Sequence, residues 1–167
     1  MSAWFPAYVA LGSNLDDPAA QVRRGLQRLA QIARTRLVAF SRLYRTRAFG
    51  PVRQPDFVNA AAALLTQQGA AELLHSLQQI EIQSGRPEAH EKWGPRTLDL
   101  DLLVYGDARQ ADAALTLPHP GIAQRNFVLY PLADIAPQLQ IPGLGLVAAL
   151  RARTSAEGIW PLAVGGL

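Results

Sequence analysis

The order of strand-like and helix-like segments constrains the fold of this chain more than any other feature of its sequence. The segments with strand composition are residues 4–12, 36–46, 57–66 and 98–105. Two segments between them, residues 18–34 and 70–85, carry apolar side chains at helical spacing. The order strand, helix, strand, strand, helix, strand is typical of a split ferredoxin-like α+β sheet, so we predict an antiparallel sheet with helices packed on one face. The opposite face is expected to be covered by loops or left open, and a ligand could lie there.

Local signals place the ends of these segments. Asp16, Asp17 and Pro18 are typical of a helix start, and Gly85 is placed as a helix stop. The predicted buried stripe of the first helix consists of Val22, Leu26, Leu29 and Ala33. The alanines of residues 57–66 suit a helix as well as the strand that we favour. Residues 124–137 are expected to form a further helix that a proline ends, and the apolar tail beyond them has no assigned form.

The composition excludes several classes of protein. With 167 residues the chain is expected to form one globular domain, residues 1–167. No window approaches the roughly 18 uncharged apolar residues that a membrane helix needs, and no secretory signal is recognised at the N-terminus, so we expect a cytoplasmic protein. The absence of cysteine excludes disulfides, thiolate metal ligands and thiol nucleophiles. Of the 16 basic residues only Lys92 is a lysine, and arginine suits phosphate and carboxylate, although a net charge of +3 decides nothing alone.

Two acids interrupt the otherwise apolar run LDLDLLV. Because side chains alternate along a strand, Asp99 and Asp101 are predicted to share one face, about 7 Å apart. Leu98, Leu100 and Leu102 are predicted to point to the other face, toward the core. Two such carboxylates raise each other's pKa unless a cation lies between them. Mg²⁺ prefers one or two carboxylates together with waters and phosphate oxygens. The pair therefore predicts a metal that arrives with phosphate, and the alternative is the wet face of an amphipathic strand.

Neighbouring residues favour the metal interpretation. Arg86 and Lys92 lie in the polar loop of residues 86–97, and Arg96 lies just before the strand. Cations beside a carboxylate pair suit the binding of a triphosphate. Neither a P-loop motif nor the G-x-G-x-x-G pattern occurs, so side chains and metal would have to hold the phosphates. The single glycine of LGSN at residues 11–14 is explained by a tight turn from strand to helix.

Several motifs, taken together and in order, resemble the 6-hydroxymethyl-7,8-dihydropterin pyrophosphokinases of folate biosynthesis. The matching segments are YVALGSNL at 8–15, YRT at 44–46, QPDFVNAAAAL at 54–64, IEIQSGR at 80–86, WGPRTLDLDLLVYG at 93–106, LPHP at 117–120 and RNFVLYPLADIAP at 125–137. The combination of GPRTLDLD with PHP and a following R-x-F is highly specific.

The resemblance implies Mg²⁺-dependent transfer of the terminal diphosphate of ATP to the hydroxymethyl group of the dihydropterin, with release of AMP. By analogy, Asp99 and Asp101 would hold two Mg²⁺ ions, and Arg86 and Arg96 would join them as catalytic residues. Such a transfer depends mainly on positioning and charge neutralisation. The partners expected from the resemblance are therefore ATP and the dihydropterin, with no nucleic acid or membrane, and the protein is expected to be a monomer.

The resemblance also assigns the remaining site residues. Those expected around the pterin are Thr46, Phe49, Phe57, Asn59, Trp93 and Phe127, where the phenylalanines at 57 and 127 would stack on the ring and the amide of Asn59 would bind its edge. Those expected around ATP are Gln78, Glu81, Arg86, Lys92, Arg96, Leu102, Thr116, His119 and Arg125. Without the resemblance, the two stacking phenylalanines would be interpreted as core residues and His119 as an ordinary loop histidine.

Two alternatives stay open from sequence. Ferredoxin-like sheets often bind RNA through exposed aromatic residues, but an RNP-like pattern is absent, and two acids on a central strand would repel phosphate unless a metal intervenes. The other alternative is a paralogue that binds pterin or nucleotide with little turnover. It is suggested by Glu88, where some members of the family have a basic residue, and by Lys92 and Ala114, where members have arginine.

Overall fold

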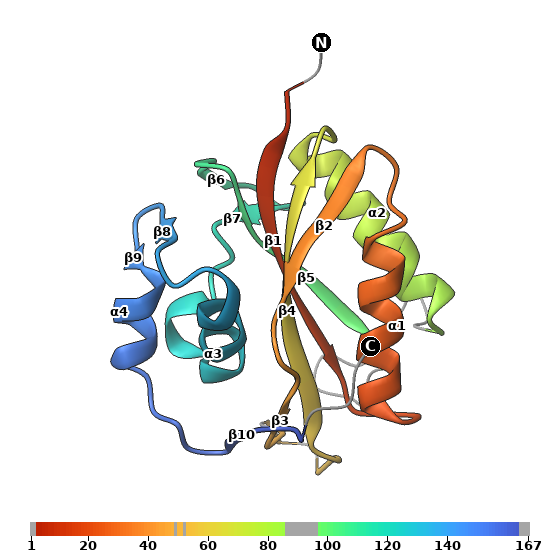
Figure 1. Cartoon of the computed structure of the whole chain (residues 1–167), viewed down its shortest axis with the longest axis vertical. Coiled ribbons are helices and arrows are strands. Elements are labelled where there is room, and N and C mark those ends of the chain that lie inside the picture. Colours follow the sequence, from red (N-terminus) through yellow and green to blue (C-terminus); the bar gives the residue numbers. More distant parts are fainter. Residues whose placement is uncertain (1–2, 49, 52, 86–96, 164–167) are drawn as a thin grey trace.

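The computed structural model describes residues 3–48, 50–51, 53–85 and 97–163, and it shows a central sheet between two helical layers (Figure 1). The long strands are β1 (Phe5–Ser13), β2 (Thr35–Phe40), β4 (Phe57–Thr66) and β5 (Asp99–Tyr105). The short ones are β3 (Tyr44–Thr46), β6 (Gln110–Ala111), β7 (Thr116–Leu117), β8 (Gln140–Ile141), β9 (Gly145–Leu146) and β10 (Ile159–Pro161). The helices are α1 (Pro18–Leu29), α2 (Ala70–Gln83), α3 (Asn126–Ile135) and α4 (Val147–Ala152), with a 3₁₀ turn, η1, at Ile122–Gln124.

All pairings in the main sheet are antiparallel. The strand order is β10-β3-β4-β1-β5, and β2 pairs with the same edge of β4 as β3 does. The central strands β1 and β4 are in register from Phe5 opposite Thr66 to Ser13 opposite Val58. The predicted antiparallel α+β sheet is confirmed, and residues 57–66 form a strand, which resolves their ambiguity.

One face of the sheet packs against α1 and α2, as predicted (Figure 1). Leu98, Leu100 and Leu102 belong to this core. The alternation of side chains along and just before β5 therefore points these three leucines toward α1 and α2. Gly25 of α1 is also buried, and a Cβ there would lie 3.1 Å from Leu11 Cδ2. The glycine therefore allows the helix to approach the sheet closely.

The second face is not left to loops, because α3 and α4 cover part of it (Figure 1). Val128, Leu129 and Leu132 of α3 pack with Ala61 of β4 and Leu103 of β5 in a second apolar cluster. The C-terminal tail, whose form the sequence did not indicate, supplies α4 and the edge strand β10. The helices thus leave one end of this face uncovered, and the candidate site lies there.

Two predicted boundaries are wrong. The helix expected to reach residue 34 ends at Leu29, and the turn after it includes Arg34 at φ 54, so Ile32 rather than Ala33 is buried. The single strand expected at residues 36–46 is two strands, because Ser41 interrupts it. The Oγ of Ser41 accepts a hydrogen bond from the backbone N–H of Ala61 at 2.9 Å in place of a backbone carbonyl.

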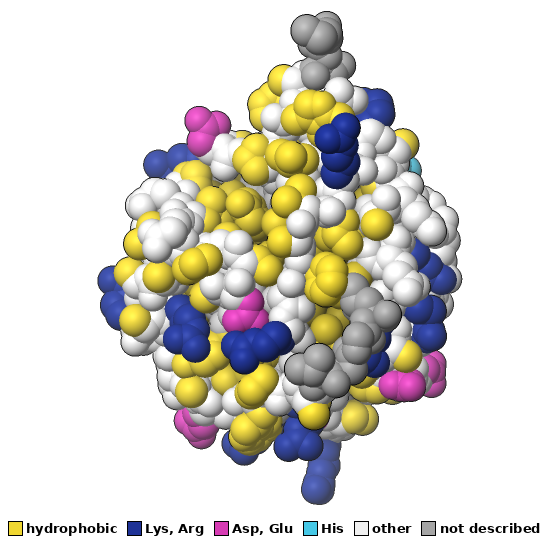
Figure 2. Space-filling view, viewed as in Figure 1, with side chains coloured by type: hydrophobic (Ala, Val, Ile, Leu, Met, Phe, Trp, Pro, Cys, Tyr) yellow, Lys and Arg dark blue, Asp and Glu magenta, His cyan; other side chains and the backbone are white. Residues whose placement is uncertain are grey.

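Figure 2 shows apolar side chains gathered over the sheet between the two helical layers, while the basic side chains on this face are dispersed. The exposed large apolar residues of β1, β2 and the segment before β1 are Trp4, Phe5, Val38 and Phe40. None of the helices in the described part of the chain combines the length and apolar character that a membrane crossing requires.

Candidate active site

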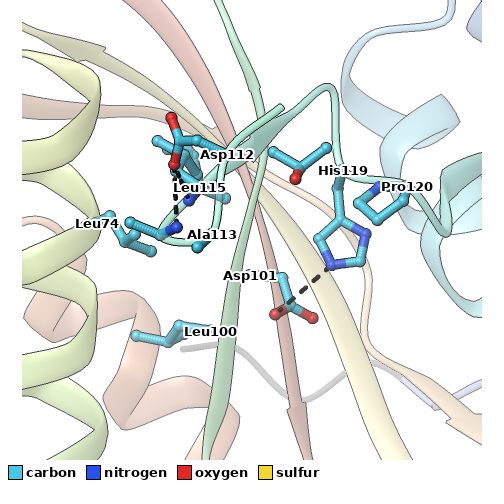
Figure 3. Close-up of a pocket in the computed structure, with 11 residues that line it drawn as sticks. Leu74, Leu100, Asp101, Asp112, Ala113, Leu115, His119 and Pro120 are labelled. Carbon is cyan, nitrogen blue, oxygen red and sulfur yellow. Dashed lines mark hydrogen bonds and ion pairs between the residues drawn. The ribbon is translucent and has the colours of Figure 1, made fainter. Parts of the chain in front are cut away.

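Two cavities meet at the side chains of Asp101 and His119, which line both. The larger cavity, of about 840 Å³, opens between the uncovered end of the second sheet face, the start of α3 and residues 154–158. The smaller cavity, of about 270 Å³, lies between α2, β5 and the turn before β7 (Figure 3). A site of this form can hold two different ligands whose reacting groups meet at the junction.

The strand register brings the polar residues of the larger cavity together. Asp99 lies opposite Gly12 of β1, which in turn lies opposite Asn59 of β4. Directly paired residues in an antiparallel sheet share a face. Asp101 is two residues along β5 from Asp99, on the same face, and lies opposite Ala10. Both aspartates are half-buried and line the larger cavity.

The two aspartates suit magnesium, which takes few ligands from a protein, better than they suit a metal whose ligands all come from protein side chains. Within residues 3–48, 50–51, 53–85 and 97–163, no group of three or more His, Asp or Glu side chains is placed to hold a metal ion. Magnesium is commonly held by one or two carboxylates, with waters and substrate phosphates completing the octahedron. Asp99 and Asp101, on one face of a strand and open to a cavity, fit that arrangement.

His119 is oriented by its own loop. Its Nδ1 accepts a hydrogen bond from the backbone N–H of Gly121 at 3.1 Å, which leaves Nε2 4.0 Å from Asp101 Oδ1 (Figure 3). Burial lowers the pKa of His119 from its usual 6.5, an effect that Arg125 reinforces and Asp101 opposes. A neutral imidazole with an acceptor at Nδ1 carries its proton on Nε2. His119 therefore presents an N–H donor at the junction of the cavities.

The side chain of Arg125 lies against Gly121, in the loop that follows His119. A Cβ at Gly121 would meet the Cζ of Arg125 at 2.6 Å, so the glycine leaves room for the guanidinium. The Cζ also lies 5.8 Å from the ring centroid of Phe127, and both side chains line the larger cavity. A cation and an aromatic face thus stand together near the carboxylate pair.

The amide of Asn59 is oriented by a hydrogen bond to Thr46 and by the space that Gly12 leaves for it. Its Nδ2 donates to Thr46 Oγ1 at 2.6 Å, and its Oδ1 occupies space above Gly12, where a Cβ would lie 2.7 Å away. Asn59 and Thr46 are both buried. Gly12 was attributed to a turn between strand and helix, but it lies inside β1, where the absent side chain makes room for the amide of Asn59. A fixed amide beside an aromatic side chain can recognise the edge of a planar heterocycle.

The wall of the smaller cavity depends on Asp112. Its Oδ1 accepts hydrogen bonds from the backbone N–H groups of Ala114 and Leu115 at 3.0 and 2.9 Å (Figure 3). These bonds lower the pKa of Asp112 and fix the turn between β6 and β7. The opposite wall is apolar and includes Leu74, Leu100 and Leu102.

The structure brings most of the sequence-predicted residues together. The larger cavity is lined by Thr46, Phe57, Asn59, Asp99, Asp101, His119, Arg125 and Phe127. The smaller cavity is lined by Asp101, Leu102, Thr116 and His119. The predicted residues Phe49, Arg86, Lys92, Trp93 and Arg96 lie outside the described residues.

Two predicted nucleotide residues are not among the described lining of either cavity. Gln78 is exposed on α2. Glu81 is buried, and its Oε2 accepts a hydrogen bond from the backbone N–H of Leu100 at 2.8 Å. Glu81 therefore anchors the start of β5 to α2, whatever else it binds.

Other lining residues were missed by sequence reasoning. Leu74 of α2 packs against the core and also reaches the smaller cavity. Asn126 lines the larger cavity from within the matching segment 125–137, although no role was predicted for it, and residues 154–158 add further groups that no motif marked. Gly12 had a usable signal, because a glycine inside a strand often marks a close approach of another group.

Comparison with known proteins agrees with this geometry. Residues 8–137 match the family described as 7,8-dihydro-6-hydroxymethylpterin-pyrophosphokinase. The chain belongs to this family. It is 46% identical to the 2-amino-4-hydroxy-6-hydroxymethyldihydropteridine pyrophosphokinase of Pseudomonas aeruginosa, over 91% of this chain and 93% of that one. Proteins of the same name from Haemophilus influenzae and Bacillus subtilis are 42% and 37% identical, over 86% and 92% of this chain and 89% and 87% of theirs.

Solved structures show the same pyrophosphokinase fold. The wild-type HPPK-DHPS of Plasmodium falciparum superposes with a TM-score of 0.68 in its complex with STZ-DHP and 0.70 in its complex with pterin and p-hydroxybenzoate. The sequence identity is 14% in both cases, so the likeness concerns the fold. Each superposition covers 92% of this chain but only 42% or 43% of the other, so the chain spans less than half the length of those proteins.

Proposed function

We propose that this protein transfers diphosphate from ATP to the hydroxymethyl group of 6-hydroxymethyl-7,8-dihydropterin, giving AMP and the pterin diphosphate. The observation that carries the proposal is the position of Asp101, beside Asp99, at the junction of two cavities of different size. Membership of the family and relatives of this name over most of the chain support it. The protein is proposed to act as one domain over residues 1–167, as a cytoplasmic monomer with small-molecule substrates only.

The larger cavity suits the pterin. Phe57 and Phe127 offer aromatic surfaces from β4 and α3, and the amide of Asn59 is held next to them by Thr46. Stacking suits a flat bicyclic ring, while an oriented amide selects its pattern of donors and acceptors. The hydroxymethyl group would then point toward Asp99 and Asp101.

The smaller cavity suits the base of the nucleotide, with its phosphates at the junction. Asp99 and Asp101 would hold magnesium, proposed as two ions, which would neutralise the phosphate oxygens when bound. His119 donates from Nε2, and Arg125 adds a positive charge on the same side. Arg86, Arg96 and Lys92 are proposed to add cations. Trp93 is proposed to close over the site, and the backbone near Phe49 to help bind the edge of the pterin.

The reaction needs no covalent intermediate with the protein. The hydroxyl oxygen of the pterin forms a bond to the β-phosphorus of ATP, the bond from that phosphorus to the oxygen bridging to the α-phosphate breaks, and the hydroxyl proton is lost to solvent. Such a displacement requires attacking and leaving oxygens roughly in line. Holding the two substrates in adjoining cavities supplies that alignment, and the donors at the junction stabilise the charge on the phosphate.

A direct test measures AMP formation from ATP with the dihydropterin and magnesium present together and with each omitted. The variants Asp99→Asn and Asp101→Asn are expected to lower kcat by about 100-fold or more, because a neutral amide is a poor magnesium ligand. Asp107→Asn, an exposed acid beyond the end of β5, is the matched control. Normal turnover in both site variants overturns the metal assignment, and binding of both ligands without AMP formation by the wild type would indicate a non-catalytic paralogue.

A further inference from the structure

Residues 154–158, here called the crosspiece, form a wall of the larger cavity that no sequence motif marked. Thr154, Ser155, Glu157 and Gly158 all line this cavity. The crosspiece follows α4 and leads into β10, and it lies beyond the residues 8–137 that match the family. It therefore adds a boundary to the site that the shared motifs do not contain.

Asn126 ties the crosspiece to α3. Its Nδ2 donates two hydrogen bonds, to the backbone carbonyls of Ser155 and Glu157, each at 2.8 Å. One side-chain amide thus uses both of its N–H groups on backbone two residues apart. A second tie from α3 is longer, since the hydroxyl of Tyr130 lies 3.3 Å from the carbonyl oxygen of Thr154.

The other end of the crosspiece is tied to β3. The backbone N–H of Arg47 donates to the carbonyl of Gly158 at 2.9 Å, and Ile159 pairs with Thr46 in the sheet. The crosspiece therefore spans from the start of α3 to the end of β3. Asn126 is next to Phe127 in the chain, and Arg47 is next to Thr46, so both ends are adjacent to residues proposed to bind the pterin.

We propose that Asn126 is a positioning residue for the pterin, acting through the crosspiece. By holding the carbonyls of Ser155 and Glu157, it fixes the separation between the α3 wall, which carries Phe127, and the β3 side, which carries Thr46. The cavity is then shaped for a planar ring before the ring binds, which lowers the entropy lost on binding. The inference rests on the proposed function, because it takes the occupant of the larger cavity to be the pterin.

The position of Asn126 allows this role to be separated from ordinary stabilisation. Asn126 is the first residue of α3, where an aspartate interacts favourably with the positive end of the helix. Asn126→Asp therefore keeps the size of the side chain and suits the helix, but it has no N–H to donate to the two carbonyls. Asn126→Ala removes the side chain altogether, and Tyr130→Phe, which loses only the longer tie from the same helix, is the control.

The experiment measures dissociation constants by calorimetry, well below the melting temperature. The first ligand is a non-hydrolysable ATP analogue with magnesium, and the second is 6-hydroxymethyl-7,8-dihydropterin added to protein saturated with that analogue and magnesium. Both Asn126 variants are expected to weaken pterin binding by about tenfold, the loss of two modest hydrogen bonds, and to change nucleotide binding by less than about twofold. Tyr130→Phe is expected to stay within about twofold of the wild type for both ligands. Thermal unfolding of each variant is recorded alongside.

The outcomes are distinct. A wild-type protein that does not bind the pterin even with the ATP analogue and magnesium present overturns the proposed function and this inference with it. Pterin binding by the wild type together with unchanged pterin binding in both Asn126 variants overturns the inference alone, and a lowered melting temperature without a change in affinity would then show a purely structural role. Equal weakening of pterin and nucleotide binding also overturns it, because the crosspiece lines only the larger cavity.

Discussion

Gly12 and Asn59 lie directly opposite each other on β1 and β4, and a Cβ at position 12 would lie 2.7 Å from Oδ1 of Asn59. Gly12→Ala is therefore expected to displace the amide from its hydrogen bond to Thr46 and to weaken pterin binding by about tenfold or more. Calorimetry with the dihydropterin provides the measurement. Gly69→Ala is the control, since a Cβ at Gly69 meets nothing within 4 Å. Equal affinity of Gly12→Ala and wild type would show that Asn59 does not need this space to bind the ligand.

His119 is expected to act on the phosphates rather than on the pterin. His119→Ala removes the Nε2 donor at the junction, and kcat/KM for ATP should fall by about 10- to 100-fold, as for the loss of one oriented donor. Pterin affinity should change little. Steady-state kinetics with ATP as the varied substrate checks this, and His75→Ala, an exposed histidine on α2, is the control. A larger effect on pterin affinity than on the ATP kinetics would contradict the assignment.

Asp134 of α3 is expected to stabilise the fold more than Arg42, its partner. The hydroxyl of buried Tyr44 donates to Asp134 Oδ2 at 2.8 Å, while the Arg42 guanidinium, largely exposed, lies 3.0 Å from Oδ1. Asp134→Ala leaves a buried hydroxyl without its acceptor and should lower the free energy of unfolding by about 2 kcal/mol. Arg42→Ala removes a surface ion pair, which is typically worth less than about 1 kcal/mol. Urea denaturation compares the two, and a greater loss in Arg42→Ala would refute this ranking.

Tyr44 also predicts a loss of stability at high pH. Burial and the hydrogen bond to Asp134 raise the pKa of Tyr44 from 10.0 to about 12, although the adjacent Arg42 opposes the shift. The folded protein holds this proton more tightly than the unfolded chain, so the associated stability is present below pH 10.0 and is lost as the pH rises toward 12.

In Tyr44→Phe the free energy of unfolding should fall less steeply between pH 10.0 and about 12. Urea denaturation at a series of pH values from neutral upward measures this. Tyr105, whose pKa burial also raises, remains in both proteins and provides the common background. An identical slope in the two proteins over this range would exclude Tyr44 as its source.

The sequence by itself determined the order of the main strands and of the first two helices, and the shared face of the two aspartates. Strand β5 shows why, because alternation with period two is a local property, and it sends Leu98, Leu100 and Leu102 to the core and both aspartates to the other face. The motifs around Asp99, His119 and Phe127 were recognisable for the same reason. Each is a short run whose residues stay together whatever the rest of the chain does.

Only the tertiary structure decided which residues distant in sequence meet. The fit of Asn59 above Gly12 depends on the register of β1 against β4, and the anchoring of Leu100 by Glu81 depends on how α2 packs on the sheet. Asn126 reaches the crosspiece only because α3 lies over the second face and β10 joins the sheet edge next to β3. Such contacts arise from packing between elements. Packing has no local period, so the sequence does not specify which residue each of these side chains will meet.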